Sequence, residues 1–212
     1  MKVIDLTHTI SENISLFPGT EKPILRKVSE YEKNGFSETE ITLYSHVGTH
    51  IDPPAHIFEG GKTLDEFPVE HFIGKAVVID CKNAKGYITM ELLKNKMVLL
   101  EKADFLIFNT DCSKFWKKDS YLENYPHLSE EVCNYILNSN KKGIGIDAIS
   151  IDDTNTSPIK MHKKLLKENR IIIIENLTNL DAVGDAIFTL VALPLKYENS
   201  DGAPARIIAI LD

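Results

Sequence analysis

The sequence has only three cysteines. Their positions indicate neither disulfide bonds nor a structural zinc site. Cys81, Cys112 and Cys133 are an odd number, lie far apart and include no C-x-x-C pair. This spacing excludes the disulfide framework of small secreted proteins, and it excludes a zinc knuckle. We therefore expect a protein of the reducing cytoplasm.

Long hydrophobic runs are also lacking. The N-terminal segment, residues 1–5, does not begin the apolar stretch of a signal peptide, and no run approaches the roughly 18 residues of a membrane span. We therefore expect a soluble protein that has no membrane partner.

Basic residues are not in excess, because the net charge is −7 at pH 7. A general nucleic-acid binder needs clustered Lys and Arg opposite the phosphates, so we expect no nucleic-acid partner. The content of 43% hydrophobic and 26% charged residues is ordinary for a globular protein. A length of 212 residues allows a substantial core and suggests one domain over residues 1–212.

Short β-rich runs separated by turn residues predict about nine strands. They cover residues 3–6, 24–28, 38–44, 75–80, 105–109, 143–146, 171–175, 187–193 and 206–211. The runs 105–108 and 171–174 are uniformly apolar, which indicates strands that are buried on both faces of a sheet.

Helical patterns are fewer, and two segments indicate loops. The helices are expected at residues 89–96, 129–138 and about 157–168, where Pro158 suits the first turn. The Gly60-Gly61 pair and the polar segment 196–205 predict loops. The fold class that follows is α/β, a single domain with a large mixed central sheet that helices cover.

The most informative stretch is residues 46–56, with the sequence HVGTHIDPPAH. Three of the seven histidines and the carboxylate of Asp52 fall within these eleven residues. Imidazole and carboxylate together are the ligands that a divalent transition metal prefers. Ordinary loop histidines are the alternative. We favour a metal site, because the segment also contains a glycine that allows the chain to bend and two prolines that make the following backbone rigid.

The spacing of His46 and His50 constrains the backbone between them. In an extended strand they would lie roughly 13 Å apart, at about 3.3 Å per residue, whereas a metal–nitrogen bond is only about 2.0 to 2.1 Å long. The chain must therefore curl. Gly48 tolerates a sharp bend, or a single helical turn would place both histidines on one face before Pro53 and Pro54 end it.

Two histidines and one aspartate leave an ion under-coordinated, and two further candidates stand out. Glu175 ends the apolar run 171–174, where a lone carboxylate is costly unless it is paired or metal-bound. It could equally mark the exit of the strand into solvent. His162 precedes two lysines in the expected helix, where a solvated helix face is the alternative. From position alone, the two interpretations of Glu175 are about equal, whereas the solvated helix face is favoured for His162.

These residues resemble the metal-dependent cyclase and kynurenine formamidase (arylformamidase) family, whose signature is H-x-G-T-H-x-D-x-P-x-H. The sequence matches every fixed position, namely His46, Gly48, Thr49, His50, Asp52, Pro54 and His56. Further likeness covers residues 4–8, 17–19, 145–150, 175–177 and 201–206. The resemblance therefore extends over nearly the whole chain.

The resemblance implies a swivelling β/β/α-type fold, a homo-oligomer (a dimer or tetramer) and one or two metal ions per chain. The ion is usually Zn²⁺ in the formamidases and Mn²⁺ in some relatives. Carried over by position, His46, His50 and Asp52 hold the first ion, and Asp52, His162 and Glu175 hold the second. Asp52 would bridge the ions, with Glu175 as a second candidate bridge.

His56 is the candidate catalytic acid/base. A bound divalent metal lowers the pKa of its water from 15.7 to about 7, and the resulting hydroxide could attack the formyl carbon of a formamide. His56 has an unperturbed pKa near 6.5 and follows a rigid Pro-Pro pair, so it suits proton delivery to the leaving amine. The alternatives are an outer hydrogen-bond partner or a fourth ligand.

Phe17 is a candidate aromatic wall for the substrate, because it precedes a turn at residues 17–19; a packed core aromatic is the alternative. The formamidases tend to carry Trp at this position, which weakens the inference about the substrate. Phe115 and Trp116 could restore aromatic surface or pack at a subunit interface. We expect Cys112 to be a buried or unreactive thiol.

The leading hypothesis is a metal-dependent hydrolase of an aryl formamide such as N-formylkynurenine, a small-molecule substrate. A second hypothesis is a cyclase or hydrolase that forms or opens a lactam, lactone or related ring with the same chemistry. A third is a binding protein that metal ions only stabilise. Closed structural zinc sites favour Cys and His ligands, and this set is carboxylate-rich and thiol-free, so the third hypothesis ranks last.

Overall fold

A mixed eight-stranded sheet forms the centre of the computed structural model, which describes residues 1–154 and 159–211. Its strands are β1 (Lys2–Asp5), β4 (His50–Asp52), β5 (Ile73–Asp80), β7 (Phe105–Asn109), β9 (Gly143–Ile146), β10 (Ile172–Glu175), β11 (Phe188–Pro194) and β12 (Ala203–Leu211). They lie in the order β1-β12-β11-β5-β7-β9-β10-β4. An additional pairing of β12 with β4 gives the sheet a barrel-like core.

The sheet is mixed, as the sequence predicts. Strands β5, β7, β9 and β10 run parallel to their neighbours within this set. The pairings that involve β1, β4, β11 and β12 are antiparallel. The α/β fold class is therefore confirmed.

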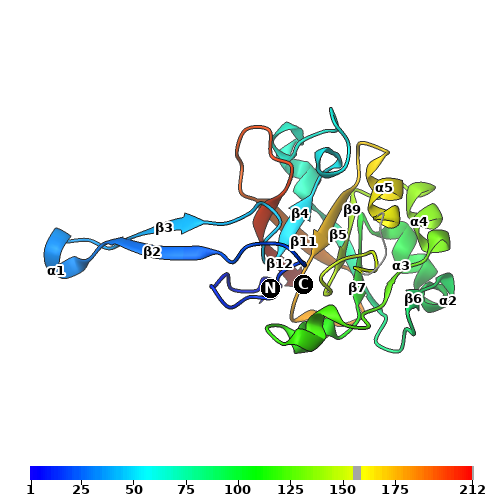
Figure 1. Cartoon of the computed structure of the whole chain (residues 1–212). Helices are drawn as coiled ribbons and strands as arrows, with labels where there is room; N and C mark the ends of the chain where they lie inside the picture. Colours follow the sequence, from blue (N-terminus) through cyan, green and yellow to red (C-terminus); the bar gives the residue numbers. More distant parts are fainter. Residues whose placement is uncertain (155–158, 212) are drawn as a thin grey trace.

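The parallel strands are buried on both faces, as their uniformly apolar sequences predict. In β5, Val77 and Ile79 join one apolar cluster, and Ala76 and Val78 join the other. This alternation follows from the two-residue period of a strand. The helices α2 (Met90–Leu93), α3 (Met97–Lys102), α4 (Glu130–Leu137) and α5 (Lys160–Leu166) cover the first cluster (Figure 1).

The expected helices are present, although two differ from the prediction in extent. Helix α4 begins after Ser129, whose side chain accepts a hydrogen bond from the Val132 backbone N–H. The helix expected at 89–96 is α2 followed by a 3₁₀ turn, and the sequence analysis missed α3 because that turn interrupts a single helical period. In the segment expected at 157–168, helix α5 covers Lys160–Leu166, while Ser157 and Pro158 lie outside the described residues.

One loop prediction is partly wrong, and the sequence patterns did not predict β4 of the central sheet or the two short strands at Tyr87–Ile88 and His127–Leu128. Residues 60 and 61 form a turn, as expected. The loop expected at 196–205 ends earlier, because Ala203 and Pro204 already belong to β12, where they pair with Ile51 and His50. Strand β4 itself has only three residues, too few to show an alternating pattern. It forms because β10 and β12 pair with it.

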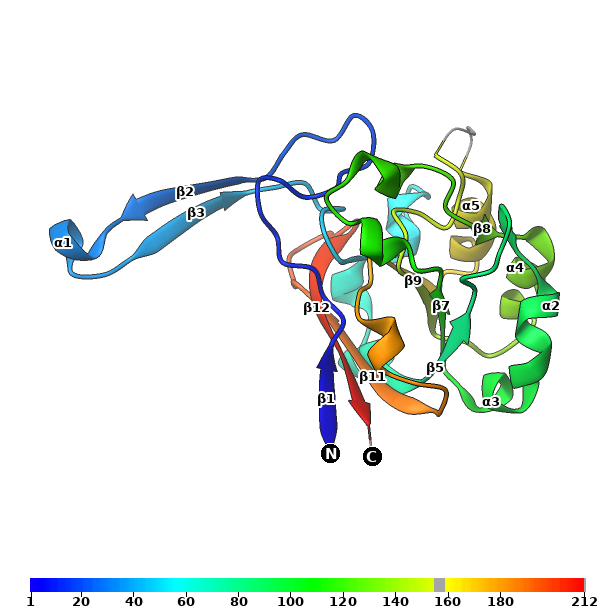
Figure 2. The same ribbon diagram turned by 90° about the horizontal axis from the view of Figure 1, so that it is seen from below.

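A β-hairpin projects from the body of the protein (Figures 1 and 2). It consists of β2 (Ile24–Ser29) and β3 (Glu38–Thr42), with the short helix α1 (Tyr31–Asn34) at its tip. A second small sheet pairs β6 (Tyr87–Ile88) with β8 (His127–Leu128).

Short 3₁₀ helices complete the described secondary structure. They are η1 (Pro54–His56), η2 (Leu64–Glu66), η3 (Val69–Phe72), η4 (Lys94–Lys96), η5 (Cys112–Phe115), η6 (Asp119–Leu122) and η7 (Leu180–Ala182). Within residues 1–154 and 159–211, the helices are all too short or too polar to cross a membrane.

Candidate metal centre

Strands β4 and β10 place three of the expected ligands together. Their antiparallel register sets His50 opposite Glu175. Residues two apart on a strand share a face, so His50 and Asp52 point to the same side, while Ile51 joins the apolar core on the other. The pairing of two strands that are distant in sequence therefore builds the floor of the site.

A bend at Gly48 brings His46 back to this floor. Gly48 has a φ of 68°, in the left-handed region that glycine adopts without strain. The two histidine rings then lie edge to face, with their centroids 5.3 Å apart. Of the two geometries that the spacing allowed, the bend is the one that forms, and the helical turn is absent.

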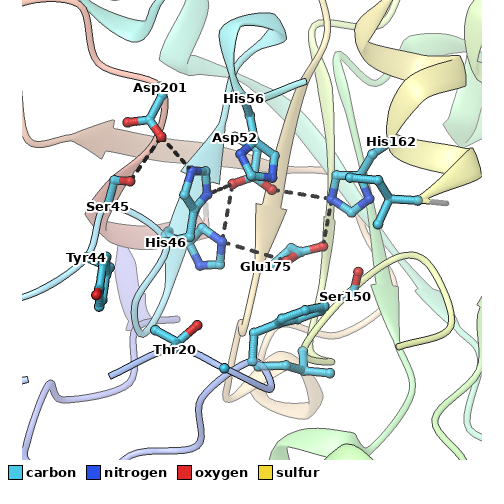
Figure 3. Close-up of a pocket in the computed structure, with 15 residues that line it drawn as sticks. Thr20, Tyr44, Ser45, His46, Asp52, His56, Ser150, His162, Glu175 and Asp201 are labelled. Atoms are coloured by element: carbon cyan, nitrogen blue, oxygen red, sulfur yellow. Dashed lines mark hydrogen bonds and ion pairs between the residues drawn. The ribbon is translucent and has the colours of Figure 1, made fainter. Parts of the chain in front are cut away.

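The two carboxylates occupy the middle of the cluster (Figure 3). Oδ1 of Asp52 lies 2.6 Å from His46 Nδ1 and 3.2 Å from His50 Nε2, and Oδ2 lies 3.5 Å from His162 Nε2. Oε1 of Glu175 lies 3.2 Å from His162 Nε2, and Oε2 lies 3.7 Å from His50 Nε2. The five expected ligands thus converge on one centre.

His162 and Glu175 are both buried, at 3% and 5% exposure. The solvated helix face considered for His162 is therefore wrong, as is the exit into solvent considered for Glu175. A carboxylate buried to this degree needs a cation or a hydrogen-bond donor as partner.

The electrostatics of the cluster show how strongly the carboxylates attract positive charge. Burial alone would lower the pKa of His50, but the charges of Asp52 and Glu175 raise it to about 9. Burial likewise opposes the shift at His162, where hydrogen bonds to carboxylates raise the pKa well above its usual value. In the absence of a metal, protons on the imidazoles balance the buried acids. A cation that binds here must displace those protons.

Each of the three candidate ligand histidines is held through its other ring nitrogen. The pairs are His46 Nε2 with Asp201 Oδ2 at 3.2 Å, His50 Nδ1 with the Gly48 carbonyl at 2.9 Å, and His162 Nδ1 with Asp152 Oδ2 at 2.7 Å. Metal-ligating histidines commonly donate their second N–H to a carboxylate or carbonyl in this way. The donor set and its outer partners therefore fit a divalent transition metal.

The sequence analysis did not identify Asp152 or Asp201 as members of the site. Asp201 opens the stretch 201–206 that supported the family resemblance, which was the available signal. Asp152 gave no comparable signal. It reaches His162 only because the chain folds back after β9, and it also accepts hydrogen bonds from the backbone N–H groups of Met161 and His162.

His56 lies over the cluster, at the end of the 3₁₀ turn that Pro53 and Pro54 begin. Its ring centroid is 3.9 Å from that of His46. Burial lowers the pKa of His56 to about 4, so the ring is neutral at pH 7. Its nitrogen also lies within 4.8 Å of ligand atoms of His46 and Asp52, which places it within reach of a bound ion as well as of a substrate.

Two groups of potential ligand atoms overlap at Asp52. Within the described residues, one group contains His46, Asp52 and His56, and the other contains His50, Asp52 and Glu175. Because Asp52 belongs to both groups, its carboxylate lies where a ligand shared by two ions would have to lie. The division differs from the family-based expectation: His56 joins His46 and Asp52 in the first group, His50 groups with Glu175 instead, and His162 belongs to neither group.

The cluster forms the floor of a pocket of about 510 Å³ (Figure 3). Its described lining residues are Phe17, Gly19, Thr20, Tyr44, Ser45, His46, His50, Asp52, His56, Ile149, Ser150, Ile159, His162, Glu175 and Asp201. Phe17 is 40% exposed and belongs to this wall, so the packed-core alternative is wrong. No Lys or Arg side chain occurs among these lining residues.

The other aromatic candidates do not reach the described part of this pocket. Trp116 stacks on His8, with ring centroids 4.1 Å apart, and packs edge-on against Tyr121. Phe115 is exposed elsewhere. Cys112 is buried, and burial raises the pKa of its thiol to about 11, which agrees with the expected unreactive thiol.

Replacing Asp152 is expected to weaken metal binding without removing a ligand. In Asp152→Ala, the His162 ring loses the carboxylate that orients it, so we expect the metal dissociation constant to rise about 10- to 100-fold. Competition with a chromophoric chelator measures this. Glu130→Ala is the matched control, because Glu130 anchors α5 through Lys160 and Lys164 but does not contact His162. Equal losses in both variants would contradict a specific role for Asp152.

Comparisons with known proteins show the family to which the chain belongs. The family model described as "Putative cyclase" matches residues 4–153. The chain is 31% identical to a kynurenine formamidase of Bacillus cereus over 207 residues, which are 97% of this chain and 95% of that protein. It is 36% identical to an uncharacterized protein of Methanocaldococcus jannaschii over the full length of both chains.

Two solved structures have the same fold over almost their whole length. An isatin hydrolase bound to the product analogue thioisatinate is 25% identical, with a TM-score of 0.87 over 99% of this chain and 92% of that one. A potential metal-dependent hydrolase with cyclase activity is 28% identical, with a TM-score of 0.80 over 98% of each chain. The chain therefore belongs to the cyclase family and is a metal-dependent hydrolase.

Proposed function

We propose that the protein hydrolyses the amide bond of aryl formamides such as N-formylkynurenine. The observation that carries this proposal is the buried cluster of three histidines and two carboxylates at the floor of a pocket of about 510 Å³. The similarity to the kynurenine formamidase of Bacillus cereus supports the choice of a formamide.

One or two ions per chain would occupy the cluster, with Zn²⁺ as the first candidate and Mn²⁺ as the second, because His and carboxylate ligands suit both. His46, His50 and Asp52 would hold one ion, and Asp52, His162 and Glu175 the other. When bound, such an ion polarises the substrate carbonyl and lowers the pKa of a water to about 7.

The side chains of the protein supply orientation and proton transfer. His56 is neutral at pH 7 and lies above the ligands, so it can accept a proton from the attacking water and return it to the leaving nitrogen. The C–N bond then breaks, and the products are formate and the free arylamine. Asp52 and Glu175 would act as ligands and take no part in the proton transfer.

The walls of the pocket suit an aromatic ring with polar substituents. Phe17 and Tyr44 provide ring surface, and Thr20 and Ser45 provide hydroxyl groups. Since the described lining contains no Lys or Arg, a substrate carboxylate would depend on hydroxyl or backbone donors. Neutral and zwitterionic aryl formamides should therefore be better substrates than purely anionic ones.

A cyclic amide is the second candidate substrate. The similarity to the isatin hydrolase structure favours it, since that protein is bound to a product analogue, thioisatinate. The same cluster could open a lactam or lactone ring by attack on its carbonyl carbon, with the ring heteroatom as leaving group. Ring formation would be the reverse of this step.

A substrate panel separates these functions. Protein loaded with Zn²⁺ or Mn²⁺ would be incubated with N-formylkynurenine, simpler aryl formamides, isatin, other lactams and lactones. The proposal predicts the highest kcat/KM for an aryl formamide. Preference for ring opening would favour the second candidate, and no turnover of any compound would favour a binding role for the metal site.

We also propose that the protein is a homo-oligomer, a dimer or tetramer, in which the β2–β3 hairpin contacts a second copy. A two-stranded hairpin alone in water is marginally stable, yet this one projects from the body (Figure 2). Its side chains Ile24, Val28 and Ile41 are exposed. The segments at its base carry Phe17, Thr20, Tyr44 and Ser45, which line the pocket. A second copy that covers the hairpin would also fix this wall.

Replacing Ile41 is expected to break the oligomer. Ile41→Glu places a charge on the exposed apolar surface of the hairpin, and we expect the molar mass from light scattering to fall to about 24 kDa, that of one chain. Val98→Glu is the matched control, because Val98 is similarly exposed, at 66% against 58%, but lies on α3. An unchanged mass for Ile41→Glu would contradict the hairpin contact.

A further inference from the structure

We infer that Tyr121 and Asn176 are positioning residues that fix the orientation and the tautomer of the His50 ring and thereby the affinity of the metal centre. They form a hydrogen-bonded chain from Tyr121 through Asn176 and the Gly48 carbonyl to His50. Neither side chain lines the pocket among the described residues, so both act through the ligand. The inference rests on the metal site of the proposed function.

The chain of hydrogen bonds begins at the ligand. His50 Nδ1 lies 2.9 Å from the carbonyl oxygen of Gly48. A carbonyl can only accept a hydrogen bond, and this contact is shorter than the 3.4 Å between His50 Nδ1 and Asn176 Nδ2, so Nδ1 carries a proton and donates it to the carbonyl. In the neutral ring, this leaves the lone pair on Nε2, the nitrogen that faces Asp52 and Glu175. The Gly48 carbonyl therefore selects the tautomer that a metal requires.

Asn176 holds that carbonyl in place. Its side-chain Nδ2 donates to the Gly48 carbonyl at 2.9 Å, and its backbone carbonyl accepts the Thr49 hydroxyl at 2.6 Å. Asn176 follows β10 directly and has a φ of 58°, a left-handed conformation that Asn tolerates better than most residues. From this position, Asn176 hydrogen-bonds to both Gly48 and Thr49, the two residues that form the bend between His46 and His50.

Tyr121 fixes the orientation of the Asn176 amide. Because Nδ2 must face the Gly48 carbonyl, Oδ1 is left to accept, and the Tyr121 hydroxyl donates to it at 2.7 Å. Without that donor, the Asn176 amide could rotate and place its Oδ1 against the carbonyl oxygen of Gly48. Tyr121 belongs to η6, and its buried ring is packed by Trp116. A residue 55 positions earlier in the chain thus determines which amide atom faces the bend.

Metal affinity of purified variants tests the inference. The variants are Tyr121→Phe, which removes only the hydroxyl, and Asn176→Gly, which keeps a residue suited to positive φ. We expect the Zn²⁺ dissociation constant to rise about 10-fold in Tyr121→Phe and about 100-fold in Asn176→Gly, the range typical of outer partners of metal ligands. In the zinc-loaded protein, the ¹⁵N spectrum should show the His50 Nδ1 proton, which becomes less well protected from exchange in both variants.

The double variant distinguishes positioning from a general loss of stability. If Tyr121 acts through Asn176, the double variant should bind Zn²⁺ no more weakly than Asn176→Gly alone, to within a factor of about two. Ile136→Val, a buried substitution on α4 that removes none of the hydrogen bonds of this chain, is the stability control and should bind Zn²⁺ normally.

Normal Zn²⁺ affinity in Tyr121→Phe would overturn the inference, as would additive effects in the double variant or an equal loss in Ile136→Val. If Asn176→Gly does not fold, Tyr121→Phe against Ile136→Val decides alone. Failure of the unaltered protein to bind Zn²⁺ or Mn²⁺ would instead contradict the proposed metal centre itself, so the two failures are distinguishable.

Discussion

Asp52→Ala is expected to abolish both metal binding and turnover. Asp52 contacts all three ligand histidines, at 2.6 Å, 3.2 Å and 3.5 Å, and it belongs to both groups of ligand atoms. Loss of this carboxylate removes the one side chain that both ions would share. Metal analysis should find no bound ion, and kcat/KM should fall at least about 10³-fold, because loss of even one electrostatic partner of a transition state costs about 10²- to 10³-fold.

Two further variants control for folding and charge. Asp52→Asn keeps the shape of the side chain and should also lose the metal, since the amide is a weaker ligand than the carboxylate. Asp185→Ala removes the same charge from an exposed position and should keep both the ion and the activity. Tight metal binding by Asp52→Ala would contradict the central place of Asp52.

His56→Ala is expected to keep its metal and to lose most of its turnover. The ring of His56 lies against that of His46, and one of its nitrogens lies within 4.8 Å of ligand atoms of His46 and Asp52. General acid/base groups typically contribute about 10²- to 10⁴-fold to the rate, so kcat should fall by that factor while metal content stays unchanged. Metal analysis and steady-state kinetics on the same preparation measure both quantities.

The metal content of the His56 variant decides between the roles considered for this residue. An ion-free His56→Ala protein would make His56 a ligand, as its distance from ligand atoms of His46 and Asp52 allows. Unchanged kcat with bound metal would make it an outer partner only. His71→Ala is a suitable control, because His71 is partly buried but hydrogen-bonds to the Lys142 carbonyl, away from the pocket.

Local sequence was enough to predict the parts of the site that lie close together in the chain. The spacing of His46 and His50 required a bend, and Gly48 indicated where it would be. The uniformly apolar run before Glu175 predicted a doubly buried strand, which is β10. These features follow from short-range geometry, so they need no knowledge of the fold.

Features that depend on contacts between segments far apart in the sequence could not be predicted from local sequence patterns. Strand β4 exists because β10 and β12 pair with it, and the outer partner of His162 comes from a loop ten residues earlier. The contact between Tyr121 and Asn176 likewise joins segments that share no sequence pattern. The projecting hairpin was predicted as two strands, but nothing in their sequence indicated that they would leave the body of the protein.

Crystals grown with Zn²⁺ and measured at the zinc absorption edge would test the account most directly. We predict an anomalous peak about 2.0 to 2.2 Å from His46 Nδ1, His50 Nε2 and an oxygen of Asp52, with or without a second peak beside His162 and Glu175. A structure in which these side chains point apart, with no peak among them at saturating Zn²⁺, would contradict it.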